Sequence, residues 1–104
     1  MSSKKISRYK LPESITIFGV VFKVERSYLD GLMGQCDRDD HTIKIHQDLS
    51  EKEAKHTLVH EALHGALAIT GQSDLLKDKH EEGLVRMLEN YLVDIIDYDK
   101  FFSR

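Results

Sequence analysis

The stretch LVHEALHGAL, residues 58–67, constrains the fold of this chain more than any other segment. Most of its residues are apolar, as in a segment that packs against a core, yet it also contains His60, Glu61 and His64. Polar and ionisable groups that are buried without partners are costly. The segment must therefore fold so that these three side chains find partners or meet a common ligand.

Helix signals surround this stretch. Ser50 and Glu53 have the spacing of a capping box, in which the serine hydroxyl and the glutamate carboxylate each accept from the other's backbone N–H. With Gly71 as a C-terminal stop, the pattern predicts a helix over residues 51–70. A second helix is predicted over residues 78–96, because its apolar residues keep a helical period: Leu84, Val85, Leu88, Tyr91, Leu92, Ile95 and Ile96.

The first half of the chain has the composition of β-strands. Residues 15–25 (ITIFGVVFKVE) are rich in β-branched and aromatic types, and Gly19 interrupts them, which predicts two short strands or one bulged strand. Residues 28–35 indicate a loop that leads into an extended segment. CDRDDHTIKIH then predicts a hairpin with its turn near residues 37–40 and a half-buried strand over residues 42–46. The fold class is therefore α+β.

His60 and His64 stand one helical turn apart, so both imidazoles project from one face and can converge on one cation. With Glu61 between them they form the H-E-x-x-H arrangement, in which two histidines bind zinc and the glutamate takes a proton from the bound water. The flanking residues are uncharged, as the longer zinc-peptidase pattern requires. The residues themselves thus predict a zinc (Zn2+) site.

A catalytic zinc ion usually has three protein ligands, so a third is needed. The second predicted helix opens with three candidates, His80, Glu81 and Glu82. With Leu88 as the centre of the apolar face, Glu81 lies about 20° from that centre. Glu82 lies about 120° away and His80 about 80° away on the other side. This geometry favours Glu81 as the ligand, with Glu82 as the alternative and His80 behind both.

Composition narrows the class of protein. The chain has 104 residues, which suits a single domain, and its net charge of −3 argues against a general nucleic-acid binder. No apolar run approaches the roughly 18 residues that span a bilayer. The single cysteine fits a reducing compartment, so we expect a cytoplasmic protein. Residues 1–13 are expected to form a flexible basic arm, with its charge on Lys4, Lys5, Arg8 and Lys10.

The strand-rich start, TIKIH, LVHEALHGAL and the EEGLV of the second helix together resemble the small gluzincin-type zinc metallopeptidases encoded by phages and prophages. They are also similar to the core of the ImmA/IrrE-type metalloproteases. The resemblance covers about residues 14–96 and implies a minimal zincin-like core within a single domain, residues 14–104. It also implies that the cytoplasm in question is that of a bacterium or of a phage-infected host cell. In such a core a short twisted antiparallel sheet packs on the active-site helix. Carried over, His60, His64 and Glu81 match the metal ligands and Glu61 the catalytic base.

The sequence departs from that family in one respect. Some gluzincins place an acid four residues after the ligand glutamate to orient a ligand histidine, whereas Val85 follows Glu81 at that distance and Arg86 follows Glu82. The group that would orient an imidazole through its other nitrogen is therefore not identified by the sequence.

The expected function is that of a zinc-dependent metallopeptidase acting on a peptide or protein substrate. Two alternatives stay open: a non-catalytic zinc-binding interaction module of a phage or prophage, and a metallohydrolase of a non-peptide substrate. Residues 42–46 could offer a strand edge to an extended peptide or simply lie within a sheet. Candidate donors to a tetrahedral oxyanion are Tyr91, His80, His46 and His56.

Overall fold

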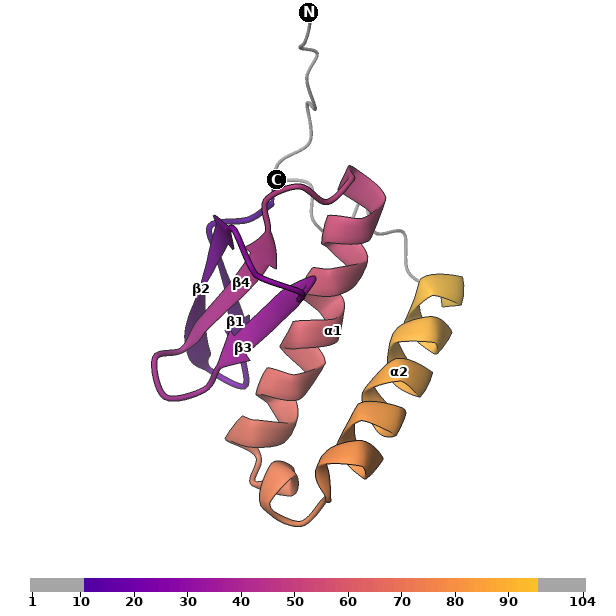
Figure 1. The fold of residues 1–104 in the computed structure, drawn as a ribbon. Coiled ribbons are helices and arrows are strands. Elements are labelled where there is room, and N and C mark those ends of the chain that lie inside the picture. Colours follow the sequence, from indigo (N-terminus) through magenta and orange to yellow (C-terminus); the bar gives the residue numbers. More distant parts are fainter. Residues whose placement is uncertain (1–10, 96–104) are drawn as a thin grey trace, which may run out of the picture.

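A computed structural model describes residues 11–95 (Figure 1). Four strands, β1 (Ser14–Ile17), β2 (Val20–Ser27), β3 (Gly34–Asp37) and β4 (Thr42–His46), precede α1 (Glu51–Ile69), the short 3-10 helix η1 (Gln72–Asp74) and α2 (Asp78–Ile95). The strands form one sheet, and α1 lies between this sheet and α2. The predicted α+β class is confirmed. The basic residues of the predicted arm and residues 96–104 lie outside the described residues.

The first two strands form a tight hairpin. Ser14 pairs with Lys23 and Ile17 with Val20, which leaves Phe18 and Gly19 as a two-residue turn. Both turn residues have positive φ, 48° and 81°, the conformation whose twist matches that of antiparallel strands. Of the two predictions for this segment, two separate strands is the one that the structure confirms.

The prediction of an antiparallel sheet is wrong at its centre. The strand order is β1-β2-β4-β3, and β2 and β4 run parallel, with Lys23 opposite Thr42 and Ser27 opposite His46. Residues 28–33 connect β2 to β3 and leave room for one strand between them, so that β3 lies at the edge of the sheet. The predicted hairpin then returns β4 into the gap beside β2. Residues 42–46 are therefore inside the sheet and offer no edge, whereas β3 is an edge strand that contacts α1.

The core lies between the sheet and α1. Phe22, Ile43 and Ile45 are completely buried on the sheet, and Leu58 and Ala54 meet them from the helix. Leu11 packs against this cluster while partly buried, so the end of the predicted arm is part of the folded unit. This packing fixes which face of α1 is turned toward the sheet and thereby leaves the histidine face toward α2.

The helix boundaries follow the capping signals. The Ser50 hydroxyl accepts from Glu53 N at 3.2 Å, and the Glu53 carboxylate accepts from Ser50 N at 3.1 Å. Gly71 adopts a left-handed φ of 81° immediately after the end of α1, which confirms it as the stop. Within residues 11–95, neither helix is long and apolar enough to cross a bilayer.

Candidate metal centre

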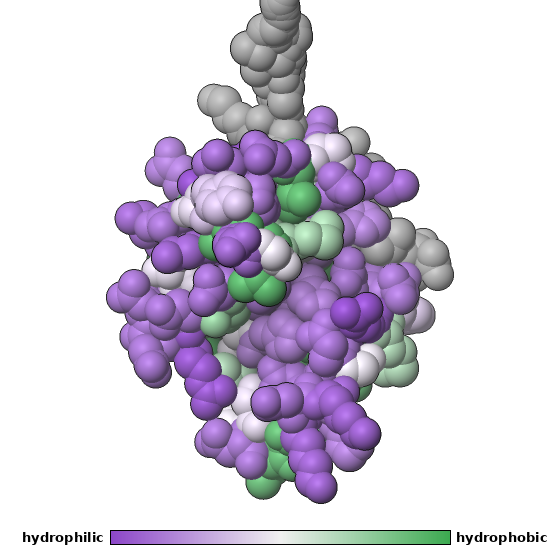
Figure 2. Space-filling view, in the orientation of Figure 1, coloured by the Kyte–Doolittle hydropathy of each residue, from purple (hydrophilic) through white to green (hydrophobic). Residues whose placement is uncertain are grey.

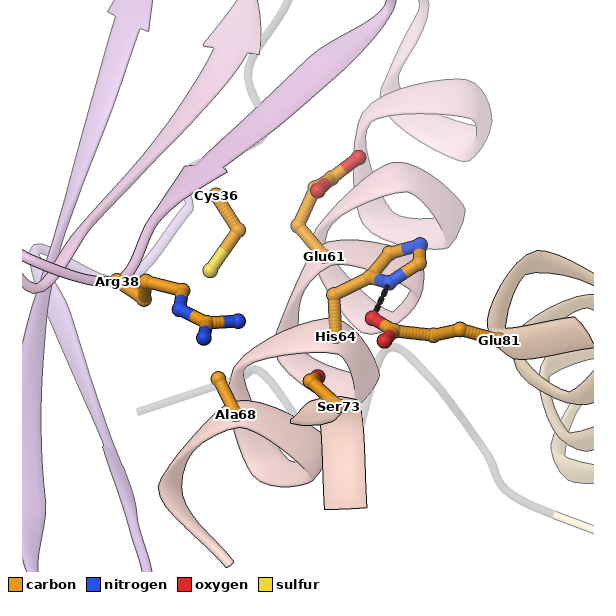
Figure 3. A pocket seen from close by; sticks show the side chains of 7 residues that line it. All are labelled: Cys36, Arg38, Glu61, His64, Ala68, Ser73 and Glu81. Carbon is orange, nitrogen blue, oxygen red and sulfur yellow. Dashed lines mark hydrogen bonds and ion pairs between the residues drawn. The ribbon is translucent and has the colours of Figure 1, made fainter. Parts of the chain in front are cut away.

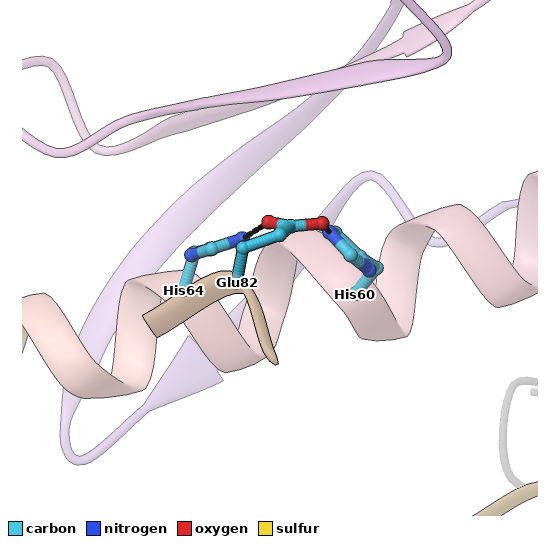
Figure 4. A group of neighbouring side chains, drawn as sticks. All are labelled: His60, His64 and Glu82. Atoms are coloured by element: carbon cyan, nitrogen blue, oxygen red, sulfur yellow. Dashed lines mark hydrogen bonds and ion pairs between the residues drawn. The ribbon is translucent and has the colours of Figure 1, made fainter. Parts of the chain in front are cut away.

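His60 and His64 lie on one face of α1, as their spacing predicts, and the structure turns this face toward α2. Their ring centroids are 5.0 Å apart, and the Nε2 atom of each ring is directed at Glu82 (Figure 4). His60 Nε2 lies 3.2 Å from Oε2 and His64 Nε2 lies 2.9 Å from Oε1 of that carboxylate. One ligand atom from each of the three residues fits within a span of 4.8 Å. Two imidazole nitrogens and one carboxylate oxygen therefore meet at one point.

The structure places Glu81 elsewhere than in this group. Its Oε2 atom lies 2.6 Å from Nδ1 of His64, the ring nitrogen opposite to the one that meets Glu82. The Glu81 side chain does point inward, with 14% of its surface exposed against 37% for Glu82. A helical-wheel angle reports which side chain faces inward, but it does not report which ring nitrogen a long side chain reaches. The carboxylate that joins both histidines is thus Glu82, the sequence alternative.

Each histidine also has a carboxylate on its second ring nitrogen. Glu89 Oε1 lies 3.0 Å from His60 Nδ1, and Glu81 Oε2 occupies the equivalent place on His64. A carboxylate that accepts from Nδ1–H fixes the ring orientation and leaves the Nε2 lone pair for a metal. These are the orienting partners that the sequence did not identify. Glu89 could have been found by its spacing, because it stands seven residues, about two turns, after Glu82 on α2.

The contacts between the histidines and the carboxylates shift the pKa values of both kinds of group. Burial alone would lower the pKa of His64, but its hydrogen bonds to Glu81 and Glu82 outweigh burial and raise that pKa above its ordinary value. For Glu82, burial would raise the pKa, but the hydrogen bond from Arg86 Nε at 2.9 Å together with the nearby His60 and His64 outweighs burial and lowers that pKa. A cation that binds at the two Nε2 atoms would replace the contacts that these nitrogens make with the Glu82 carboxylate.

Glu61 faces away from α2, toward the edge strand. It is 9% exposed, and a Cβ placed on Gly34 of β3 would lie 3.3 Å from its Oε2 atom. Burial raises the pKa of Glu61, while the neighbouring His60 and His64 oppose that rise. The predicted base is thus a carboxylate next to the histidine pair that holds a proton more readily than an exposed glutamate does.

A pocket of about 200 Å³ opens beside these groups (Figure 3). Three of its lining residues, Glu61, His64 and Glu81, belong to the site described above. The others come from β3, the turn after β3, the end of α1 and η1, and they are Cys36, Arg38, Ala68 and Ser73, in that order. None of the four predicted oxyanion donors lines it. His46 instead packs edge-on against Tyr28, and the side chains of Tyr91 and His80 are exposed.

Comparisons of the chain with protein-family models, with curated proteins and with solved structures found no match. The structure shows two helix-borne histidines and a carboxylate from a second helix, with a further carboxylate on each histidine and a buried glutamate beside them. The His60, His64 and Glu82 group could hold a metal ion.

Proposed function

We propose that this chain is a small zinc-dependent metallopeptidase of the gluzincin kind. The observation that carries the proposal is the convergence of His60 Nε2, His64 Nε2 and Glu82 within 4.8 Å, with Glu61 adjacent in the chain. The arrangement is compatible with the resemblance seen in the sequence, with Glu82 in place of Glu81 as the third ligand. Glu81 then becomes a positioning residue that acts through His64.

The donor set suits zinc better than magnesium or calcium. Those harder cations prefer six or more oxygen ligands, whereas this site offers two imidazole nitrogens and one carboxylate. Three protein ligands leave a position open, which is the mark of a catalytic rather than a structural zinc site. Zinc held there would lower the pKa of a bound water toward neutrality.

Glu61 is the residue that would receive the proton. It needs to lie beside the histidines without being a ligand, and its position on the β3 side of α1 meets that condition. Glu61 would then deliver this proton to the leaving amine.

A peptide substrate is favoured by the edge strand. On its outer side β3 pairs with no strand that the structure describes, and Gly34, where β3 begins, sits against Glu61. An extended peptide can add to such an edge through main-chain hydrogen bonds, which would carry a scissile bond past the base. Residues 42–46, which the sequence left open as an edge or an internal strand, are internal, and the neighbouring strand β3 would supply the edge.

One observation favours a non-catalytic zinc module as a second candidate. Among the described side chains of α2, only Val85 is completely buried, so apolar packing alone holds this helix weakly on α1. A metal shared by His60, His64 and Glu82 would join the two helices and stabilise the fold directly.

Metal analysis and a peptide-cleavage profile of the purified chain test the proposal together. We expect one zinc per chain and hydrolysis that Glu61→Gln abolishes while zinc and fold are kept. Glu82→Gln should lose zinc at concentrations where Glu81→Gln still retains it. A metal-free folded protein would overturn the proposal, and stoichiometric zinc without any cleavage would favour the module. Cleavage confined to small esters or amides would point to a non-peptide substrate.

A further inference from the structure

We propose that the pocket beside His64 is a carboxylate-binding subsite, formed by Arg38 and Ser73, that selects substrates by an acidic group near the scissile bond. The inference rests on the proposed function, since it assigns a substrate preference to that same site. Neither residue stands out in the sequence, because Arg38 belongs to a hairpin turn and Ser73 to a short connection between helices.

Arg38 brings the positive charge. It directly follows β3, and Figure 3 shows its guanidinium group directed into the pocket toward His64. Its only hydrogen bond to a described residue is a long one, 3.4 Å, from Nη2 to Asp74 Oδ1. A guanidinium group carries five N–H donors in a planar fork that matches a carboxylate. Most of these donors are therefore left for a ligand.

Ser73 supplies a second donor. Its hydroxyl oxygen is buried and forms no hydrogen bond of good geometry with any residue in the described part of the chain. It lies near enough to Glu81 to help lower the pKa of that carboxyl group, and because a hydroxyl hydrogen rotates, it can turn to a ligand oxygen instead. A buried polar group without a partner is costly, so its position at a pocket wall indicates an acceptor oxygen from a ligand.

The two acids in the pocket do not cancel this preference. Glu81 is held by His64 at 2.6 Å, so its charge is already engaged. Glu61 is 9% exposed, whereas the Arg38 side chain is 51% exposed, so an incoming group meets the guanidinium before it meets Glu61. Asp74 forms an ion pair with Arg38 Nη2 at 3.4 Å but does not line the pocket, which leaves the remaining guanidinium donors to the pocket. A cationic group would be repelled by Arg38, and an apolar group would leave the Ser73 hydroxyl unpaired.

The carboxylate could come from an aspartate or glutamate side chain or from the C-terminus of a peptide, and small probes separate these sources. The ¹⁵N-labelled full chain, as purified, is titrated with N-acetyl-aspartate α-amide, with its neutral isostere N-acetyl-asparagine amide, and with N-acetylglycine. The readout is the Nε–H signal of Arg38, assigned by its loss in Arg38→Gln, and the backbone amide of Ser73. Arg26→Gln is the matched control, because Arg26 is an exposed arginine on β2 that does not line the pocket.

We expect saturable shifts at both positions with the aspartate probe or with N-acetylglycine, and none with the asparagine probe. Arg38→Gln should weaken carboxylate binding at least about tenfold, as loss of a hydrogen bond to a charged group does. Arg26→Gln should leave it unchanged. Ser73→Ala should weaken binding severalfold, and it serves as the second variant if Arg38→Gln does not fold.

Three outcomes would each overturn the subsite. These are equal shifts with the neutral isostere, binding that neither Arg38→Gln nor Ser73→Ala affects, and the absence of a saturable shift with any carboxylate. The titration needs neither zinc nor turnover, so its result stands apart from that of the metal analysis. A metal-free, inactive protein that still binds the aspartate probe through Arg38 would refute the proposed function and keep the subsite.

Discussion

Replacing Gly34 by alanine tests how closely the edge strand lies on α1. A Cβ at this position would lie 2.5 Å from Cγ2 of Thr57 and 3.1 Å from Cγ of Glu61. Carbon atoms pack at about 3.5–4.0 Å, so the added methyl group would overlap Thr57 by about 1 Å. Thr57 is itself 7% exposed, so relief requires β3 and α1 to move apart.

The size of the effect follows from two opposing contributions. Overpacking a tight contact costs about 1–3 kcal/mol. Alanine also restricts the unfolded chain, which returns about 0.4–1 kcal/mol. We expect Gly34→Ala to lower the free energy of unfolding by about 1–2 kcal/mol. Hydrolysis should fall as well, because the displaced side chain next to Thr57 is Glu61.

Urea denaturation followed by far-UV circular dichroism measures the change, with Gly83→Ala as the matched control. Gly83 lies in α2 with nothing within 4 Å of an added Cβ, so alanine there should stabilise the protein by about 0.5–1 kcal/mol. Thr57→Ser removes the clashing methyl group and should recover most of the loss in a double variant with Gly34→Ala. Gly34→Ala with wild-type stability, or a double variant without recovery, would refute the close approach of β3 to α1.

Three further predictions concern single side chains. Glu89→Gln should weaken zinc binding about 10–100-fold in a chelator competition, because Glu89 orients His60 from 3.0 Å; an unchanged affinity would contradict that role. Burial and the nearby Glu61 raise the pKa of the Cys36 thiol to about 11, so at pH 8.5 iodoacetamide should alkylate the folded protein far more slowly than the urea-unfolded chain. The backbone N–H and hydroxyl of Ser50 lower the pKa of Glu53 below its ordinary 4.5, so the capping box contributes stability above that pH and loses it as the pH falls through the lower folded value. The stability difference between wild type and Glu53→Gln should therefore shrink below pH 4.5, and a difference that does not depend on pH would contradict this reasoning.

Much of the fold could be predicted because its signals are local. The capping box at Ser50 and the left-handed Gly71 define α1 through contacts between residues only a few positions apart. The spacing of His60 and His64 places both imidazoles on one face of any helix, whatever packs around it. The turn at Gly19 similarly separates β1 from β2 by backbone geometry alone. In each case the backbone geometry of a few consecutive residues is sufficient to predict the feature.

The tertiary structure decided everything that depends on where distant segments meet. No periodicity reports that residues 28–33 skip one strand position, and this crossing makes β4 internal and turns β3 into the edge beside Glu61. Nor does a helical angle report how far a glutamate reaches across to a neighbouring helix. The reach of these side chains from α2 brings Glu82 to both Nε2 atoms and leaves Glu81 and Glu89 on the Nδ1 atoms. The sequence by itself determined the helix and the two histidines that it carries, because those follow from local backbone geometry; the carboxylates around them follow from the packing of α2 on α1.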